Sequence, residues 1–184
     1  MIWYLPESVQ IGYSEYSINA DYRDILEIIQ KLNDLNESTF IKILVALAMF
    51  YPGFDSIPDK LYQEAAEKMM WFISCGEEND GKKHPKLIDW EQDYRMIVSD
   101  INRIAGKDVR GEKFLHWWTF VSWFNGIGEG QLSFVVGIRD KLRRGKKLSA
   151  PEREFYRKNR SVVDFKTVYT EEDETILNNW IGKG

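Results

Sequence analysis

The residue types that most often act as nucleophiles or zinc ligands are scarce in this chain. It contains one cysteine, Cys75, and two histidines, His84 and His116. A zinc site takes three or four ligands at recognisable spacings, and these three residues do not have such a spacing. Cys75 is expected at the end of a helix, where the helix dipole disfavours a thiolate. The sequence therefore favours a plain thiol at Cys75 and a hydrogen-bonded helix residue at His116.

Carboxylates form two short clusters, which could serve acid–base catalysis or bind a metal ion. Asp89 stands three residues before Gln92, the spacing of a capping box at the start of a helix. The other carboxylates have the pattern of a solvated surface. We therefore expect no enzyme activity and no cofactor. The clusters consist of Glu77, Glu78 and Asp80, and of Asp89, Glu91 and Asp93.

The strongest charge feature is a basic segment, residues 139–160. It holds ten Lys and Arg residues against three carboxylates, a local charge of +7, so the rest of the chain, whose total is −4, carries −11. Three explanations fit this separation of positive from negative charge. The segment could be an ordinary solvated helix and loop, it could bind an acidic partner or a second copy of the chain, or it could bind nucleic acid. Few aromatic residues accompany the charges, which disfavours single-strand binding. The candidate contact residues are Arg143, Arg144, Lys146 and Lys147.

Large aromatic side chains are concentrated in Phe114–Gly128, which holds three tryptophans and three phenylalanines. Such side chains bury much area in cores or anchor interfaces. Their helical spacing favours packing in the core. Trp118 and Trp123, however, are about 140° apart on an ideal helix, so one apolar surface does not serve both. These two tryptophans are therefore candidate partner anchors.

The rest of the sequence supplies the elements that position these residues. Apolar residues alternate on both sides of Gly12, which predicts a short β-hairpin over Ser8–Asn19. Apolar spacing then predicts helices. Those before residue 112 cover Asp21–Leu32, Ser38–Phe50 (with Asn36 as an alternative cap), Pro58–Gly76 and Asp89–Gly106. Those after it cover Glu112–Phe124, Gln131–Lys141, Ser149–Val162 and Thr170–Ile181.

We therefore expect a mainly α fold, a compact helical domain of about six to eight helices with a short N-terminal β-hairpin. The helix ending at Phe50 is apolar nearly all round, which predicts a place at the centre of the core. Residues 1–162 would form the domain, and residues 163–184 a linker and an amphipathic helix. That terminal helix would dock on its own domain or on a neighbouring subunit, through Leu177, Trp180 and Ile181.

No segment predicts secretion or membrane insertion. The first residues lack the basic and apolar stretches of a signal peptide, and the longest apolar run, Ile43–Tyr51, is far shorter than the roughly 20 residues that span a bilayer. A single cysteine excludes an internal disulfide and suits a reducing compartment. We expect a cytoplasmic protein.

Four blocks of sequence carry a resemblance to a known family. The most specific combines Asp89–Asp93, Leu115–Phe120 and Gly137–Arg139. The others are Ser17–Ile28, Ala48–Pro52 and Trp71–Gly76. In order and spacing they resemble the phage gene-product-fifteen family of Gram-positive tailed phages and prophages, over most of residues 1–160.

The resemblance implies a tail assembly chaperone without catalytic residues or cofactors. Such a protein coats the tape-measure protein before the tail tube forms, which makes the tape-measure protein, the tail tube protein and further copies of the chain the expected partners. It would act in the cytoplasm of the bacterial host and be absent from the mature virion. The alternative function is a nucleic-acid-binding accessory protein that uses the basic segment.

Overall fold

The computed structural model describes residues 4–77 and 85–166. It is mainly helical with one N-terminal two-stranded antiparallel sheet, which confirms the predicted fold class. The chain divides into two compact units, here called the first unit (residues 4–77 with 116–118) and the second unit (residues 85–115 with 119–166). The expected helix Thr170–Ile181, with Leu177, Trp180 and Ile181, lies outside the described residues.

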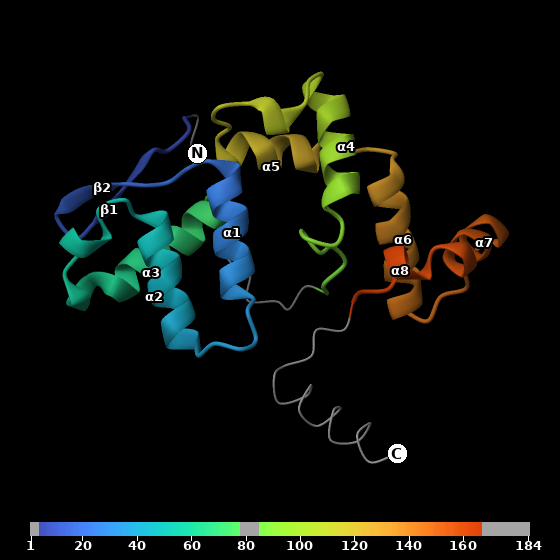
Figure 1. Cartoon of the computed structure of the whole chain (residues 1–184), viewed down its shortest axis with the longest axis horizontal. Coiled ribbons are helices and arrows are strands. Elements are labelled where there is room, and N and C mark those ends of the chain that lie inside the picture. Colours follow the sequence, from blue (N-terminus) through green and yellow to red (C-terminus); the bar gives the residue numbers. More distant parts are fainter. Residues whose placement is uncertain (1–3, 78–84, 167–184) are drawn as a thin grey trace, which may run out of the picture. The chain divides into compact units, whose positions relative to one another are not determined.

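The first unit begins with the predicted hairpin (Figure 1). Strands β1 (Ser8–Ile11) and β2 (Ser14–Ser17) pair antiparallel, with Val9 opposite Tyr16. Gly12 turns the chain at φ +58°, in the left-handed region that glycine tolerates. Its amide donates to Glu64 Oε1 at 3.0 Å, which ties the hairpin to the helix that carries this carboxylate.

Three helices complete the first unit: α1 (Tyr22–Leu32), α2 (Thr39–Phe50) and α3 (Tyr62–Ile73), with short 3-10 turns at Phe54–Ser56 and Asp59–Leu61. Ser38 caps α2 as predicted, because its hydroxyl accepts from the amide of Ile41 at 3.4 Å. The predicted central position of α2 is wrong. Only Ala46, Leu47 and Phe50 are buried on it, since α1 and α3 cover one side of the helix and leave the other open.

The end of α3 differs in one detail from the cap predicted at Gly76. Gly76, the predicted cap, has φ +78°, but the residue before it, Cys75, is also left-handed at φ +55°. The amides of Cys75 and Gly76 donate to the carbonyls of Phe72 and Trp71, the bonding pattern of a Schellman motif. The first left-handed position is therefore filled by a cysteine, and a glycine follows it.

The second unit contains α4 (Tyr94–Ala105), α6 (Gln131–Arg143), α7 (Ala150–Lys158) and α8 (Arg160–Val163), with a 3-10 turn at Val109–Gly111. The capping box predicted at Ser149 is present, and Glu152 Oε2 accepts from the Ser149 amide at 2.7 Å. The ion pair with Lys141, together with that amide, lowers the pKa of Glu152 to about 2. The predicted helix up to Val162 is interrupted at Asn159, which separates α7 from α8.

Two sequence predictions in this part of the chain need correction. Helix α5 (Trp117–Asn125) begins at Trp117 and not near Glu112, because His116 forms an isolated bridge with Asp21 and holds the preceding chain extended. The predicted start of α4 is also displaced, since the helix was expected from Asp89 and begins at Tyr94. Tyr94 and Ile104 are 47% and 37% exposed, and the buried positions are Met96, Ile97, Asp100 and Ile101.

Two glycines, one at the end of a helix and one inside a helix, provide a matched stability test. Gly106 ends α4 at φ +68°, whereas Gly137 lies inside α6, and an added Cβ meets no atom within 4 Å at either. Alanine at 106 must adopt a left-handed conformation, so Gly106→Ala is expected to destabilise the fold by about 1 kcal/mol. Gly137→Ala should stabilise it by about 0.5–1 kcal/mol through helix propensity. Urea unfolding of both variants checks this, and equal effects would contradict it.

Candidate binding surfaces

The first candidate surface is the side of α2 that α1 and α3 leave uncovered, here called the α2 outer face. Phe40 is 70% exposed and Ile41 49% exposed. Residues four apart lie on the same side of a helix, so these two side chains continue into two half-buried ones and an exposed alanine. Leu35, in the preceding loop, is 61% exposed. The α2 outer face consists of Phe40, Ile41, Leu44, Val45 and Ala48.

Such a surface is unusual because the whole of α2, Thr39–Phe50, contains one charged residue, Lys42. The Lys42 ammonium donates to the carbonyl of Asp34, in the loop before α2, at 2.7 Å. Contiguous exposed apolar area on a protein surface marks an interaction site. Sequence analysis missed this face because it placed every side of α2 in the core.

Trp117 and Trp118 are held by the end of α3. The indole of Trp117 donates to the carbonyl of Ile73, and that of Trp118 to the carbonyl of Phe72, both at 2.9 Å. The last carbonyls of a helix lack regular intrahelical partners, and the two indoles donate to this end of α3, where the Phe72 carbonyl also accepts from the Cys75 amide. Trp117 is buried as predicted, at 2% exposure. Trp118 is half-buried against Trp71, and its use as a partner anchor stays a prediction.

His116 holds the start of α5 through the Trp118 amide. Its Nδ1 accepts from the Trp118 amide at 3.0 Å, and its Nε2 lies 2.9 Å from the carbonyl of Pro6. The ring therefore caps the start of α5 as a neutral imidazole with its proton on Nε2. His116 is 4% exposed, which agrees with a hydrogen-bonded histidine, although it precedes the helix and is not part of it.

Trp123 lies in the part of α5 that belongs to the second unit, where it is half-buried. Its neighbour in sequence, Phe124, packs on Trp90, with ring centroids 4.9 Å apart. Trp90 also lies 6.2 Å from Phe120. The aromatic segment therefore contributes to both units, and Trp123 as a partner anchor remains a prediction.

A buried ion pair in the second unit was missed by sequence analysis. Arg139 binds both carboxylate oxygens of Asp93, at 2.6 and 2.9 Å, and the two side chains are 3% and 0% exposed. The guanidinium also donates to the carbonyls of Leu87, Val162 and Val163. Asp93 is therefore not a solvated carboxylate, and Arg139 does not belong to the basic surface. Both residues lie in the blocks that carry the family resemblance.

The remaining cations of the basic segment are distributed over α6, the following loop, α7 and α8. Arg143 and Arg144 both pair with Asp140, at 3.1 and 2.9 Å, and these pairs lower the pKa of that carboxylate. Lys146 and Lys147 follow in the exposed loop. We call the exposed cations of this region the basic surface: Arg143, Arg144, Lys146, Lys147, Arg153, Arg157, Lys158 and Arg160.

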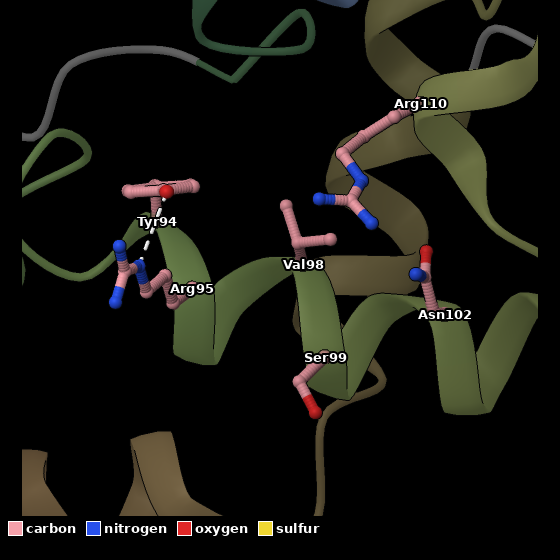
Figure 2. Close-up of a pocket in the computed structure, with 6 residues that line it drawn as sticks. All are labelled: Tyr94, Arg95, Val98, Ser99, Asn102 and Arg110. Atoms are coloured by element: carbon pink, nitrogen blue, oxygen red, sulfur yellow. Dashed lines mark hydrogen bonds between the residues drawn. The ribbon is translucent and has the colours of Figure 1, made fainter.

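A surface pocket of about 310 Å³ lies along α4 in the second unit (Figure 2). Five of its lining residues come from α4 and the sixth, Arg110, faces them. Arg95 Nε donates to the Tyr94 hydroxyl at 3.1 Å, and Arg110 pairs with Asp108 at 2.7 Å. Asn102 Oδ1 accepts from the amide of Val109. The polar groups of Tyr94, Arg95, Asn102 and Arg110 are thus used in contacts within the unit. The lining of the pocket is Tyr94, Arg95, Val98, Ser99, Asn102 and Arg110.

Cys75 is expected to react slowly with alkylating reagents. Burial, reinforced by the nearby Glu77 carboxylate, raises the pKa of the Cys75 thiol to about 11. The thiolate is the reactive form, so alkylation by iodoacetamide near pH 8 should be on the order of 100-fold slower than that of free cysteine. The rate should rise steeply up to about pH 11. Alkylation at the free-cysteine rate near pH 8 would contradict this assignment.

Within residues 4–77 and 85–166, no group of three His, Cys, Asp or Glu side chains could hold a metal ion. Over the same ranges, no helix combines the length and apolar character needed to cross a membrane. His84 lies outside the described residues.

Comparison with known proteins identifies the family. No curated protein and no solved structure gives a significant match to the chain. A family model described as Bacteriophage Gp15 protein matches residues 1–165, which covers all but the last residue of the two units and all four sequence blocks described above. The chain belongs to the Bacteriophage Gp15 protein family.

Proposed function

We propose that this phage protein is a tail assembly chaperone that binds the tape-measure protein through the α2 outer face. The observation that carries the proposal is the exposed apolar surface of α2, with Phe40 70% and Ile41 49% exposed. Family membership supports a role in phage assembly. The function is non-catalytic, and the tail tube protein and further copies of the chain are additional proposed partners. The proposed site of action is the cytoplasm of the host.

The shape of the surface suits a helical partner. A tape-measure protein is a long helix-rich chain with exposed apolar side chains, and an amphipathic helix of this kind lies in an apolar groove or on an apolar face. Phe40, Leu44 and Ala48 recur at the four-residue interval of one helix side, with Ile41 and Val45 beside them. Many such contacts, each weak, give a grip that can be released when the tail tube assembles.

The test is co-expression with the cognate tape-measure protein, followed by size-exclusion chromatography of the soluble fraction. A soluble complex is expected with the natural chain. The double variant Phe40→Ser with Ile41→Ser should weaken binding by about 10- to 100-fold, the loss typical of truncating central apolar contacts. Because both side chains are largely exposed, the fold should be retained.

A control variant replaces two exposed apolar residues of the second unit, Ile104→Ser with Leu142→Ser, each 37% exposed. This variant should bind as the natural chain does. The proposal fails if the tape-measure protein stays insoluble and unbound in the presence of the natural chain. Equal weakening by both double variants would remove α2 as the contact surface.

A further inference from the structure

The basic surface carries more positive charge than its neighbours neutralise. Asp140 is shared between Arg143 and Arg144, and Glu154 pairs with Lys158. Within residues 4–77 and 85–166, none of the other five cations has a carboxylate at ion-pair distance. A surface of this kind attracts a polyanion, and the attraction weakens with salt. The five cations are Lys146, Lys147, Arg153, Arg157 and Arg160.

The excess is local and is not a property of the whole chain. The first unit holds twelve carboxylates against five Lys and Arg residues over residues 4–77, a formal charge of −7. The second unit holds seventeen Lys and Arg residues against eleven carboxylates, a formal charge of +6. Outside the basic surface, for comparison, Lys107 pairs with Glu112 at 3.1 Å. The total charge of −4 is thus an average over oppositely charged units and does not exclude an anionic partner.

Helices α6, α7 and α8 form one framework for these cations. Helix α8 contacts both α6 and α7 (Figure 1). Lys141 of α6 pairs with Glu152 of α7 at 2.6 Å, and the rings of Phe134 and Phe155, from the same two helices, lie 5.1 Å apart in an edge-on contact. Because these contacts hold the helices together, the backbone positions of the cations are set before any partner binds.

The cations follow the loop after α6 and then one side of α7. The Lys146 amide donates to the carbonyl of Lys141 at 2.8 Å, which fixes the start of the loop. Arg153 Nη1 donates to the carbonyl of Leu148 at 2.8 Å, which joins the end of the loop to α7. Arg157 follows four residues later on the same side of α7, about 6 Å farther along its axis. The result is a row of positive charge from the loop to the end of α7.

The composition of this row favours a phosphate backbone over an acidic protein. Between residues 143 and 160, all of which the structure describes, no large apolar side chain is exposed. Protein interfaces draw their energy from buried aromatic and aliphatic anchors, to which charges at the rim add little. Binding to nucleic acid draws instead on neutralising phosphates and releasing counterions. Three of the five cations without a carboxylate are arginines, whose guanidinium groups match phosphate geometry.

The aromatic side chains of α7 favour a duplex over a single strand. Surfaces that bind single strands stack the bases on accessible aromatic rings. Phe155 packs against Phe134, and the guanidinium of Arg160 lies 5.3 Å from the centroid of the Tyr156 ring. Both rings are therefore engaged within the unit. Duplex DNA offers about one negative charge per 1.7 Å of its axis, and a row of cations neutralises this charge without touching the bases.

We propose that the basic surface binds the phosphate backbone of double-stranded DNA without reading its sequence. The five cations without a carboxylate partner each neutralise a phosphate, and the remaining ones add to the positive field that attracts the duplex. The binding is a second activity beside the proposed chaperone function, and it uses residues of the second unit alone. Because no base edge is contacted, the affinity depends on salt and not on sequence.

Fluorescence anisotropy of a labelled DNA duplex, titrated with the full chain, tests the proposal. With about five phosphates neutralised, log K should fall with log salt at a slope of about −4.5, which is about 100-fold between about 50 and 150 mM NaCl. A duplex of scrambled sequence should bind within about twofold. The variant Lys146→Gln with Lys147→Gln and Arg157→Gln should weaken binding by more than about tenfold at about 50 mM NaCl and reduce the slope to about −2.

A variant with the same change of charge is the control. Arg95→Gln with Lys107→Gln and Lys113→Gln removes three exposed cations of the second unit outside the basic surface. Its affinity should stay within about threefold of the natural chain, with the same slope. Phe40→Ser with Ile41→Ser, in the first unit, should also bind DNA as the natural chain does. DNA binding and binding of the tape-measure protein can therefore fail independently.

Three results would overturn the proposal. The first is no binding of the duplex at about 25 mM NaCl, where screening is weak. The second is equal weakening by the two triple variants, which would assign the effect to net charge and not to the basic surface. The third is tighter binding of polyglutamate or of single-stranded DNA than of a duplex with the same number of charges, which would assign the surface to a different partner.

Discussion

Replacing Asp93 with alanine is expected to destabilise the second unit by about 3–5 kcal/mol, the usual cost of leaving one member of a buried ion pair without its partner. Arg139 would keep its hydrogen bonds to backbone carbonyls but would hold an uncompensated charge at 3% side-chain exposure. Those carbonyls include Val162 and Val163, so the loss should also loosen the end of the described chain. Hydrogen exchange of peptides from α4, α6 and α8, combined with urea unfolding, measures the effect.

A surface pair provides the matched control. Glu154 and Lys158 also form an ion pair, at 2.8 Å, but their side chains are 61% and 62% exposed. Glu154→Ala should therefore change stability by less than about 1 kcal/mol. The double replacement Asp93→Leu with Arg139→Met should recover part of the loss, because apolar residues of similar volume can replace a buried pair. If Asp93→Ala proves as mild as Glu154→Ala, the ion pair does not hold this unit together.

Phe72→Ala should destabilise the first unit by about 3–5 kcal/mol, the range for removing a large aromatic side chain from a core. Phe72 is 0% exposed. Its ring centroid lies 5.4 Å from that of Phe50, 5.5 Å from His116 and 5.8 Å from Trp118. The cavity left by alanine would remove support from α2, α3 and the start of α5 together. Urea unfolding monitored by tryptophan fluorescence checks this, since Trp117 and Trp118 lie in the same cluster.

Phe40→Ala separates packing from binding. The same chemical change at a side chain that is 70% exposed should alter stability by no more than about 0.5 kcal/mol. It should nevertheless weaken the complex with the tape-measure protein if the α2 outer face is the contact surface. A large loss of stability in Phe40→Ala, or a negligible one in Phe72→Ala, would contradict the packing described for α2.

Features that depend on residues close together in the chain were determined by the sequence. The Ser38 and Ser149 hydroxyls accept from amides of the first helical turn and so cap the starts of α2 and α7. Gly106 ends α4 in a left-handed conformation. The hairpin around Gly12 follows from the alternation of its flanking residues. Each of these outcomes is set by a hydrogen bond or a backbone preference within about four residues, and four sequence blocks were enough to indicate the family.

Features that depend on what packs against a residue were decided by the tertiary structure. The apolar pattern of α2 is the same whether the helix is enclosed or half covered, so only the positions of α1 and α3 expose Phe40. Asp93 and Arg139 are 46 residues apart, and only the approach of α6 to the turn before α4 turns two ordinary charges into a buried pair. Burial and partnership are properties of long-range contacts, and a single sequence specifies these contacts only through the fold as a whole.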